Sequence, residues 1–496
     1  MEGYPMTVTA SKKVITGWAM YDWANSVYNL VITTTFFPIY FTAATKHVFK
    51  SDTIPFLGRH FNNASLYSYA LAAAYLIIAL LYPILTSIAD TRGNKKRFMQ
   101  FFCYMGSLGC SALYFFTGAN IWLGVVCFIL ASMGFVGSLV FYNSYLPEIA
   151  APEDQDRVSA KGFAFGYIGS VILQLIGFVL VLTITDDPFM GPRLTFLLVG
   201  VWWAGFAQMT FAVLPKTSRV SVQRINIFKA GFTEVRKVYA EVRKLAVMKR
   251  YLRAFFFYSM GVQTVMMAAT LFGSQLLHLE DTKLIVTVVL IQLVAIIGAV
   301  WMSKLSARFG NMRVLMGVVG FWVLICVSAY ITAGMAENLH DFHARIATIK
   351  QEREDLLARK GQLSATDYDK ASADIEGRLS REELDLQPHQ QPIEYSFYGL
   401  ALAVGLVMGG IQSLSRSTYS KLMPATKDTA SYFSYYDLTE KVAIVIGMFS
   451  FGFIGDLTGS MKNSIVFLIV FFVIGLGWLY SALRKQGRET LAAPAM

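Results

Sequence analysis

Charged and amide side chains interrupt a few of the long apolar stretches in this sequence. Asp22 lies in the first such stretch, Asn25 and Asn29 follow it at near-helical spacing, and Arg416 lies in a late stretch. A carboxylate can carry a proton or a cation, whereas a guanidinium can bind a carboxylate or a phosphate through two parallel hydrogen bonds. Amide side chains can orient a bound molecule by hydrogen bonding. The candidate substrate- or ion-binding residues are Asp22, Asn25, Asn29, Gln412, Ser413, Arg416, Asp437, Glu440 and Lys441.

The composition predicts that these residues lie inside a membrane. Of the 496 residues, 55% are hydrophobic and 15% are charged, whereas about 25% are charged in a soluble globular domain. A charge near the bilayer centre costs about 2.5–3.5 kcal/mol, so intramembrane charges normally face a cavity or a partner. A spanning helix needs roughly 20 apolar residues. Twelve spans are predicted, at about residues 15–43, 65–89, 98–118, 121–146, 159–185, 193–214, 251–277, 284–305, 313–335, 394–420, 431–456 and 463–483.

Several other classes of protein are excluded by charge placement and motif content. The net charge is +11, but the basic residues lie between the apolar runs, which indicates membrane orientation and no nucleic-acid partner. The four cysteines have no CxxC spacing, so the sequence predicts neither a disulfide framework nor a metal site. No Gly-Lys dipeptide occurs, which excludes a Walker A loop. We expect no catalytic residues and no cofactor.

The basic clusters also predict the orientation. With the N-terminus inside, the clusters within 90–97, 216–250, 304–313 and 484–488 all fall on the cytoplasmic side, where loops of a membrane protein carry an excess of Lys and Arg. The opposite orientation would place them outside. We therefore expect a multi-pass integral membrane protein with both termini in the cytoplasm.

Two long polar segments separate the predicted groups of spans. The first has apolar residues at alternating four- and three-residue spacing among basic ones, which predicts an amphipathic helix on the cytoplasmic lipid surface. The second has apolar residues near heptad spacing and a capping box from Ser364 to Asp367, which predict an antiparallel helical hairpin on the outer face. The predicted segments are an N-terminal six-helix half at 1–214, the linker at 215–250, spans seven to nine at 251–335, the hairpin at 336–393 and spans ten to twelve at 394–496.

An internal repeat relates the two groups of six spans. The segment from Tyr142 to Pro147 ends span four, and a segment with the same Tyr-to-Pro spacing, from Tyr419 to Pro424, ends span ten. Because these segments lie six spans apart, they predict two pseudo-symmetric halves with a binding site between them. The expected fold is all-α.

The loop after the second span resembles the signature loop of the major facilitator superfamily. In that family an acidic residue, a tight glycine turn and a basic cluster form a cytoplasmic latch. The equivalent loop of the second half keeps Gly310 and its cations but has Ala307 where the family often has an acidic residue. We predict that Glu148, after Pro147 at a helix end, is an interfacial gate residue. The candidate gate and latch residues are Asp90, Gly93, Lys95, Lys96, Arg97, Glu148 and Arg157.

Three further blocks resemble the vacuole-effluxer-like branch of that superfamily. They lie at residues 21–26, at 156–169 and at 410–417, in different thirds of the chain. The resemblance covers nearly all of the chain except the 336–393 insertion. It implies a secondary transporter, and the fungal vacuolar members of the branch suggest the export of amino acids.

The predicted function is movement of a small polar or zwitterionic solute, outward and driven by protons or another ion, through alternating access of the two halves. Asp22 is the preferred proton carrier, ahead of Glu148 and Asp437. In one interpretation Arg416 binds the solute. In the other, Asp22 and Arg416 pair to hold the inner gate shut, while Asp437 bridges to Lys441 one helical turn later. A pair that breaks during transport satisfies both interpretations.

Two rival functions remain open at this stage. The 38 phenylalanines and 21 methionines could line an apolar pathway for a lipid or amphiphile exporter. Alternatively, the chain is a membrane-embedded interaction or sensor protein that binds a protein partner through the 336–393 hairpin. We expect the plasma membrane of a bacterium as the location, with the lipid bilayer, a small-molecule substrate and a coupling ion as the chain's partners.

Overall fold

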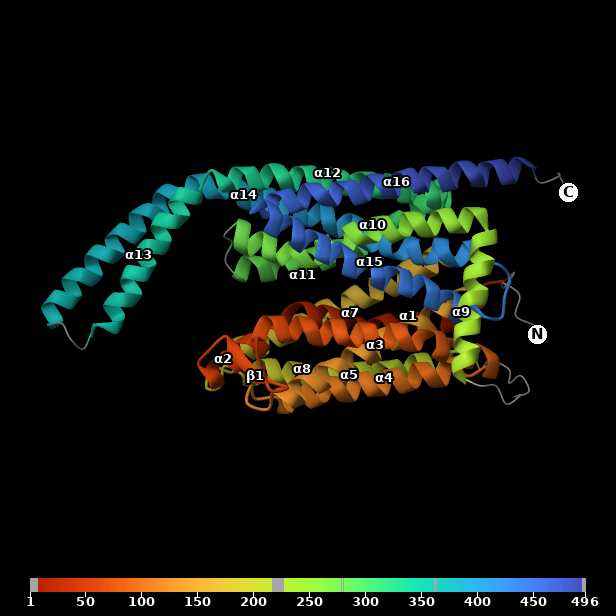
Figure 1. The fold of residues 1–496 in the computed structure, drawn as a ribbon, viewed down its shortest axis with the longest axis horizontal. Coiled ribbons are helices and arrows are strands. Elements are labelled where there is room, and N and C mark those ends of the chain that lie inside the picture. The colour runs from red at the N-terminus through yellow and green to blue at the C-terminus, as the bar shows by residue number, and fades with distance from the viewer. Residues whose placement is uncertain (1–7, 216–226, 278, 280, 361–363, 493–496) are drawn as a thin grey trace.

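Two bundles of helices lie side by side, and their helices run roughly along the long axis of the molecule (Figure 1). The computed structural model describes residues 8–215, 227–277, 279, 281–360 and 364–492, so a part of each of the five predicted segments lies outside the described residues. The N-terminal half contains α1 Lys12–Val27, η1 Tyr28–Phe36, α2 Phe37–Phe49, β1 Thr53–Phe56, β2 Arg59–Asn62, α3 Asn63–Arg92, α4 Lys95–Ala112, η2 Leu113–Phe115, α5 Ile121–Ser144, α6 Leu146–Ile149, α7 Gln155–Thr183 and α8 Met190–Val213.

The C-terminal half follows after a helix that runs across one end of both bundles (Figure 1). We call this end the inner end, because it carries the predicted cytoplasmic loops, and the opposite end the outer end. The crossing helix is α9 Ile227–Lys244, and the half contains α10 Ala246–Leu271, η3 Phe272–Leu276, α11 Asp281–Phe309, α12 Asn311–Glu337, α13 His340–Ala358, α14 Ala365–Leu422, α15 Thr429–Thr458 and α16 Met461–Ala492.

The helices are long and apolar enough for a multi-pass membrane protein. Ten of the described helices meet the length and hydropathy that a span requires. Helices α4 and α10 are not among the ten, and both begin with basic residues. Both nevertheless pack into their bundles, α4 against α5 and α8, and α10 against α15 and α16. The all-α fold in two halves agrees with the prediction, and twelve remains the number of spans that we propose.

Local sequence signals set several helix boundaries. The side chain of Asn62 accepts two backbone hydrogen bonds in the first turn of α3. That helix ends at Gly93, whose φ of 60° is left-handed and therefore suits a residue without a Cβ. At the start of α14 the Ser364 side chain accepts a hydrogen bond from the Asp367 backbone N–H, as the capping box predicts.

The first span contains a stretch of π-helix, η1, that the sequence analysis did not anticipate. The wider turn lets the Thr35 hydroxyl donate to the Leu30 carbonyl, five residues earlier, at 2.9 Å. Such stretches often occur at functional sites. Here η1 borders the central cavity described below.

Two features correct the predicted architecture at the outer end. Strands β1 and β2 form an antiparallel hairpin whose turn, Leu57-Gly58, has positive φ at both residues. Strands of four residues carry too little alternation to be recognised within a mostly apolar sequence. The second correction concerns the 336–393 insertion, which is a hairpin of α13 with the first part of α14.

Helix α14 continues without interruption from the hairpin into the bundle, so the predicted boundary at residue 393 falls inside one helix. Pro388 and Pro392 lie within it. A proline removes one helical hydrogen bond and kinks a helix, and α14 bends where the hairpin leaves the bundle (Figure 1). The base of the hairpin is held by an ion pair between Lys283 and Glu394 and by a hydrogen bond from Gln390 to the Leu277 carbonyl.

Helix α9 lies across the inner end of both halves, within the segment where the sequence predicts a linker helix. Residues 216–226 of that linker lie outside the described residues. Helix α9 packs against α3 in one half and against α10 and α15 in the other. Lys237 pairs with Asp428 at 2.6 Å, and the Tyr432 hydroxyl donates to Glu241 at 2.5 Å.

Glycines allow the helix backbones of the C-terminal half to approach closely. A Cβ added at Gly409 would lie 2.1 Å from the Ala295 carbonyl oxygen, and one added at Gly298 would lie 2.0 Å from that of Leu406. Helices α11 and α14 therefore pack at a distance that only glycine permits at these positions. This supports the packing role that the GxxxG spacing of Gly405 and Gly409 predicts.

We predict that Gly409→Ala lowers the free energy of unfolding by about 1–3 kcal/mol, because the new methyl group must separate α11 from α14. Thermal unfolding in detergent measures this change. Gly205→Ala is the matched control, since a Cβ there meets no heavy atom within 4 Å, and alanine has the better helix propensity. Equal unfolding temperatures for the two variants would contradict the packing account.

Candidate functional site

A central cavity lies between the two halves and collects most of the predicted binding residues. It encloses about 1480 Å³, including space open to solvent, and α1, η1, α3, α5 and α7 face α10, α14 and α15 across it. Eight of the nine predicted binding residues line it. Ser413 does not line it: the residue is fully buried, and its hydroxyl donates to the Gly410 carbonyl within its own helix at 3.1 Å. The eight are Asp22, Asn25, Asn29, Gln412, Arg416, Asp437, Glu440 and Lys441.

The closest charged contact across the cavity joins Asp22 of α1 to Arg416 of α14. Both terminal nitrogens of Arg416 lie 3.4 Å from Asp22 Oδ2, and the Tyr142 hydroxyl donates to the same oxygen at 2.7 Å. Asp22 is 4% exposed and Arg416 is 3% exposed. The structure therefore contains the predicted Asp22–Arg416 pair as a buried ion pair between the halves.

Every N–H group of the Arg416 guanidinium has an acceptor in this conformation. Nε donates to Ser159 Oγ at 2.9 Å, Nη1 donates to Asn143 Oδ1 at 3.2 Å, and Nη2 donates to the Ser159 carbonyl at 2.9 Å. The two contacts with Asp22 use the remaining donors. An arginine has five N–H donors, so Arg416 has none left for a solute while the pair is closed.

Small and aromatic residues enclose this ion pair. A Cβ at Gly162 would lie 2.4 Å from Asp22 Oδ2 and 3.0 Å from Arg416 Nη2, so the pair needs a glycine beside it. The guanidinium also lies over the rings of Phe163 and Trp18, with centroid distances of 4.3 and 4.9 Å. Arginine stacks favourably on aromatic faces, which partly compensates for the loss of hydration.

A second charged group lies on α15. Lys441 pairs with Glu440 at 3.1 Å, which corrects the predicted bridge from Lys441 to Asp437. The other Glu440 oxygen accepts a hydrogen bond from Gln263 of α10 at 3.1 Å. Asp437 is 5% exposed, and within the part of the chain that the structure describes its Oδ2 has no hydrogen-bond partner.

The amide residues behave differently from one another. Gln412 accepts a hydrogen bond from the Tyr167 hydroxyl across the halves at 3.0 Å. Asn25 is fully buried, and neither its amide oxygen nor its amide nitrogen has a partner among the described residues. Asn29 lines the cavity two helical turns beyond Asp22. Buried polar groups are normally satisfied, so Asn25 is available for a water molecule or a solute.

At the inner end, the predicted latch connects the N-terminal half to the start of α15. Asp90 accepts hydrogen bonds from the backbone N–H groups of Ala430 and Ser431, at 3.2 and 2.8 Å. A carboxylate at this position satisfies free N–H groups and interacts favourably with the helix dipole. Lys95 contacts Glu148 and also donates to the Thr429 hydroxyl at 2.7 Å.

A second set of inner contacts centres on Asp156, which the sequence analysis did not include among the site residues. Its carboxylate accepts hydrogen bonds from Ser306 and Asn311 at 2.6 Å each, and pairs with Lys421 at 2.8 Å. All three partners belong to the other half. The loop that has Ala307 in place of an acidic residue is thus contacted by a carboxylate of the N-terminal half. In the sequence, the position of Asp156 at the start of a predicted span was the signal that could have identified it as a site residue.

The remaining predicted latch residues lie outside these contacts. Lys96 donates to the Leu214 carbonyl at 3.2 Å, within its own half, and Arg97 is exposed. Arg157 is also exposed and pairs with Asp154 at 2.8 Å, so the structure does not place it at the gate. Hydrogen bonds from Thr9 and Arg157 hold the pKa of Asp154 below its ordinary value.

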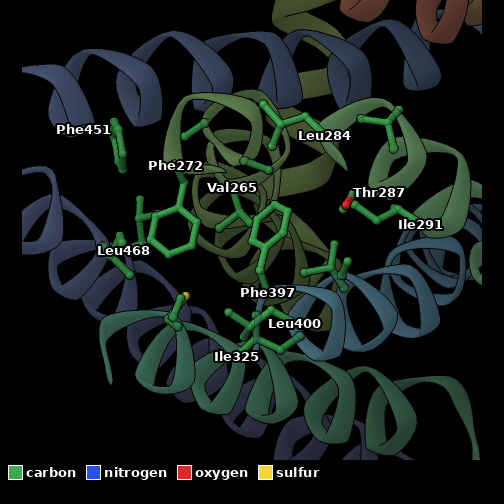
Figure 2. Close-up of a pocket in the computed structure, with 18 residues that line it drawn as sticks. Val265, Phe272, Leu284, Thr287, Ile291, Ile325, Phe397, Leu400, Phe451 and Leu468 are labelled. Carbon is green, nitrogen blue, oxygen red and sulfur yellow. The ribbon is translucent and has the colours of Figure 1, made fainter. Parts of the chain in front are cut away.

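A separate, apolar cavity lies inside the C-terminal half (Figure 2). It encloses about 790 Å³, including open space, and its lining comes from α10, η3, α11, α12, α14, α15 and α16. Side chains such as Phe272, Phe397 and Phe451 surround it in Figure 2. The Thr287 hydroxyl, the lone labelled oxygen there, donates to the Lys283 carbonyl at 2.7 Å. This cavity therefore offers few polar contacts to a solute.

We predict that Asp22→Asn lowers the free energy of unfolding by about 3 kcal/mol, because it leaves the Arg416 charge buried without its counter-ion. Arg416→Gln should have a similar effect. The double variant should be more stable than the sum of the single effects predicts, with a coupling energy of at least about 1 kcal/mol. Denaturation of the purified proteins measures the free energies of this double-mutant cycle. Strict additivity of the two single-variant effects would contradict the ion pair.

Comparison with known proteins places this geometry in a family. The family model described as Vacuole effluxer Atg22 like matches residues 10–345 and 387–492. The MFS-type transporter YxiO of Bacillus subtilis is 28% identical over 473 residues, which cover 92% of each chain. Autophagy-related protein 22-1 of Penicillium rubens is 22% identical over 577 residues, with 95% of this chain and 90% of the relative covered.

Solved structures share the fold at low sequence identity. The human organic anion transporter MFSD10 superposes with a TM-score of 0.62 at 11% identity, covering 94% of this chain and 99% of its own. A bacterial homologue of the iron transporter ferroportin, in an outward-facing state, has a TM-score of 0.60 at 12% identity and covers 95% and 98%. The chain therefore belongs to the vacuole effluxer Atg22-like family, as a multi-pass membrane transporter with the major facilitator fold.

Proposed function

We propose that this transporter exports a small polar or zwitterionic solute in exchange for protons, with amino acids as the first solutes to test. The observation that carries the proposal is the buried Asp22–Arg416 pair, which joins the two halves beside a polar cavity. Alternating access requires contacts between halves that form in one state and break in the other. An ion pair that one proton can neutralise meets this requirement.

In the proposed cycle, Asp22 is the proton carrier. A proton on Asp22 removes the charge that faces Arg416, and a buried guanidinium without a counter-ion is unfavourable. The protonated state therefore favours separation of α1 from α14 and opening of the inner end. Release of the proton inside restores the pair and closes the inner end around the bound solute.

The gate in this proposal consists of the two sets of inner contacts, at Asp90 with Lys95 and at Asp156. Each set joins residues of opposite halves through hydrogen bonds. They must break together when the inner end opens, because the halves move as units. Their location at the end that carries the basic loops supports a cytoplasmic gate.

We also propose the plasma membrane of a bacterium as the location, with both termini in the cytoplasm. Support comes from the bacterial relative, which is 28% identical, compared with 22% for the fungal one. The basic inner loops support the orientation.

Proteoliposomes test the proposed function. The purified protein is reconstituted with a pH-sensitive dye inside and pooled amino acids and small metabolites as solutes. We expect solute-dependent proton flux, with at least about a tenfold loss in Asp22→Asn, because the variant cannot bind the coupling proton. Asp456→Asn removes an exposed carboxylate from the outer part of α15 and should retain the wild-type flux.

Each other outcome of this assay contradicts part of the proposal. Full proton-coupled flux in Asp22→Asn would contradict the assignment of Asp22 and move coupling to Glu148, to Asp437 or to another ion. Absence of flux from every pool, with correctly folded protein, would contradict solute export.

The apolar cavity of the C-terminal half favours a second candidate, the export of a lipid or amphiphile. Its lining suits an acyl chain. However, it lies within one half, whereas alternating access exposes a site between halves. Movement of a labelled lipid without solute flux in the same vesicles would favour this candidate.

The hairpin of α13 and α14 remains the proposed surface for a protein partner. The family model leaves residues 346–386 unmatched, so this part of the hairpin is additional to the shared transporter. It projects beyond the bundle at the outer end (Figure 1). Loss of a partner without loss of flux, after deletion of residues 338–391, would separate docking from transport.

A further inference from the structure

The charges that line the central cavity do not balance. The lining contains three carboxylates, on Asp22, Asp437 and Glu440, and two cationic side chains, on Arg416 and Lys441. With all five groups ionised, the lining has a formal charge of −1. A low-dielectric cavity with one uncompensated negative charge attracts a cation.

Contacts between these side chains show which carboxylate lacks an ion-pair contact among the described residues. Arg416 pairs with Asp22, and Lys441 pairs with Glu440. Asp437 remains, and its Oδ2 is buried without a hydrogen-bond partner while the residue lines the cavity. A buried charge normally has a partner, and no described residue supplies one within hydrogen-bond distance of this oxygen.

We propose that Asp437 binds the protonated amine of the transported solute. This inference rests on the proposed function and names the chemical class of its solute. An ammonium group supplies three donors and one positive charge, which match the free oxygen and the missing charge. Tyr82 and Tyr436 also line the cavity, and their rings favour a nearby cation.

Arg416 does not offer a binding site for a solute carboxylate in this conformation. All five of its N–H donors are used while the inner end is closed, so it cannot bind a solute carboxylate in this state. The amine is therefore the group that the closed cavity recognises. Asn25, whose amide atoms have no partners, is available to the rest of the solute.

Equilibrium binding to the purified full-length protein tests this proposal without a proton gradient. Isothermal titration first screens the twenty standard amino acids and n-alkylamines of two to eight carbons. The tightest amino acid is then compared with the carboxylic acid that lacks its amine and with the amine that lacks its carboxylate. We expect both amine-containing molecules to bind and the deaminated acid to bind at least about tenfold more weakly.

Variants of Asp437 assign the effect to this residue. Asp437→Asn keeps the shape and removes the charge, so it should weaken amine binding at least about tenfold, and Asp437→Glu should restore part of the affinity. Asp456→Asn is the charge-matched control on the same helix and should bind as the wild type does. Thermal unfolding verifies that each variant is folded.

Three results would overturn the assignment. They are equal affinity for the deaminated acid, unchanged amine affinity in Asp437→Asn, and absence of amine binding to folded wild-type protein. Failure of the proposed function has a different signature. If amines bind through Asp437 but no proton-coupled flux occurs in vesicles, proton-driven export is wrong and the amine site stands.

Discussion

The buried ion pair between Asp22 and Arg416 is the interaction on which the rest of the site depends. Removing two charges from water costs several kcal/mol per ion, and only close geometry with further hydrogen bonds compensates for that cost. Tyr142, Asn143 and Ser159 supply those bonds, and Gly162 leaves the space for them. Because Asp22 belongs to the N-terminal half and Arg416 to the C-terminal half, the ion pair is stable only while the halves are together at this depth.

The same constraint explains the arrangement of the inner end. Asp90 reaches from the first half to the N-terminus of α15, and Asp156, at the start of α7, reaches Ser306, Asn311 and Lys421 of the second half. Both acidic residues belong to the N-terminal half, and both contact the C-terminal half. In the proposed cycle these contacts act together with the deeper pair, and charge neutralisation at Asp22 opens the gate through helices that move as units.

Much of the site follows from the cost of charge in a membrane, since that cost singled out Asp22, Arg416 and Asp437 before any geometry was known. The contacts of Asp156 could not be predicted, because they depend on how two distant segments meet. The predicted boundary between hairpin and span at residue 393 falls inside one helix, because α14 continues through its two prolines. Lys441 pairs with Glu440 and not with Asp437. Helical spacing alone does not decide which of these two carboxylates Lys441 contacts.

Whether loss of charge at Asp22 opens the inner end is measured most directly as a distance between the halves. Spin labels at Arg97 and Lys427, both exposed at the inner ends of opposite halves, report that distance by pulsed electron spin resonance in a cysteine-free background. The account predicts one short population in otherwise wild-type protein and a second, longer population in Asp22→Asn. Identical distance distributions in the two proteins would contradict it.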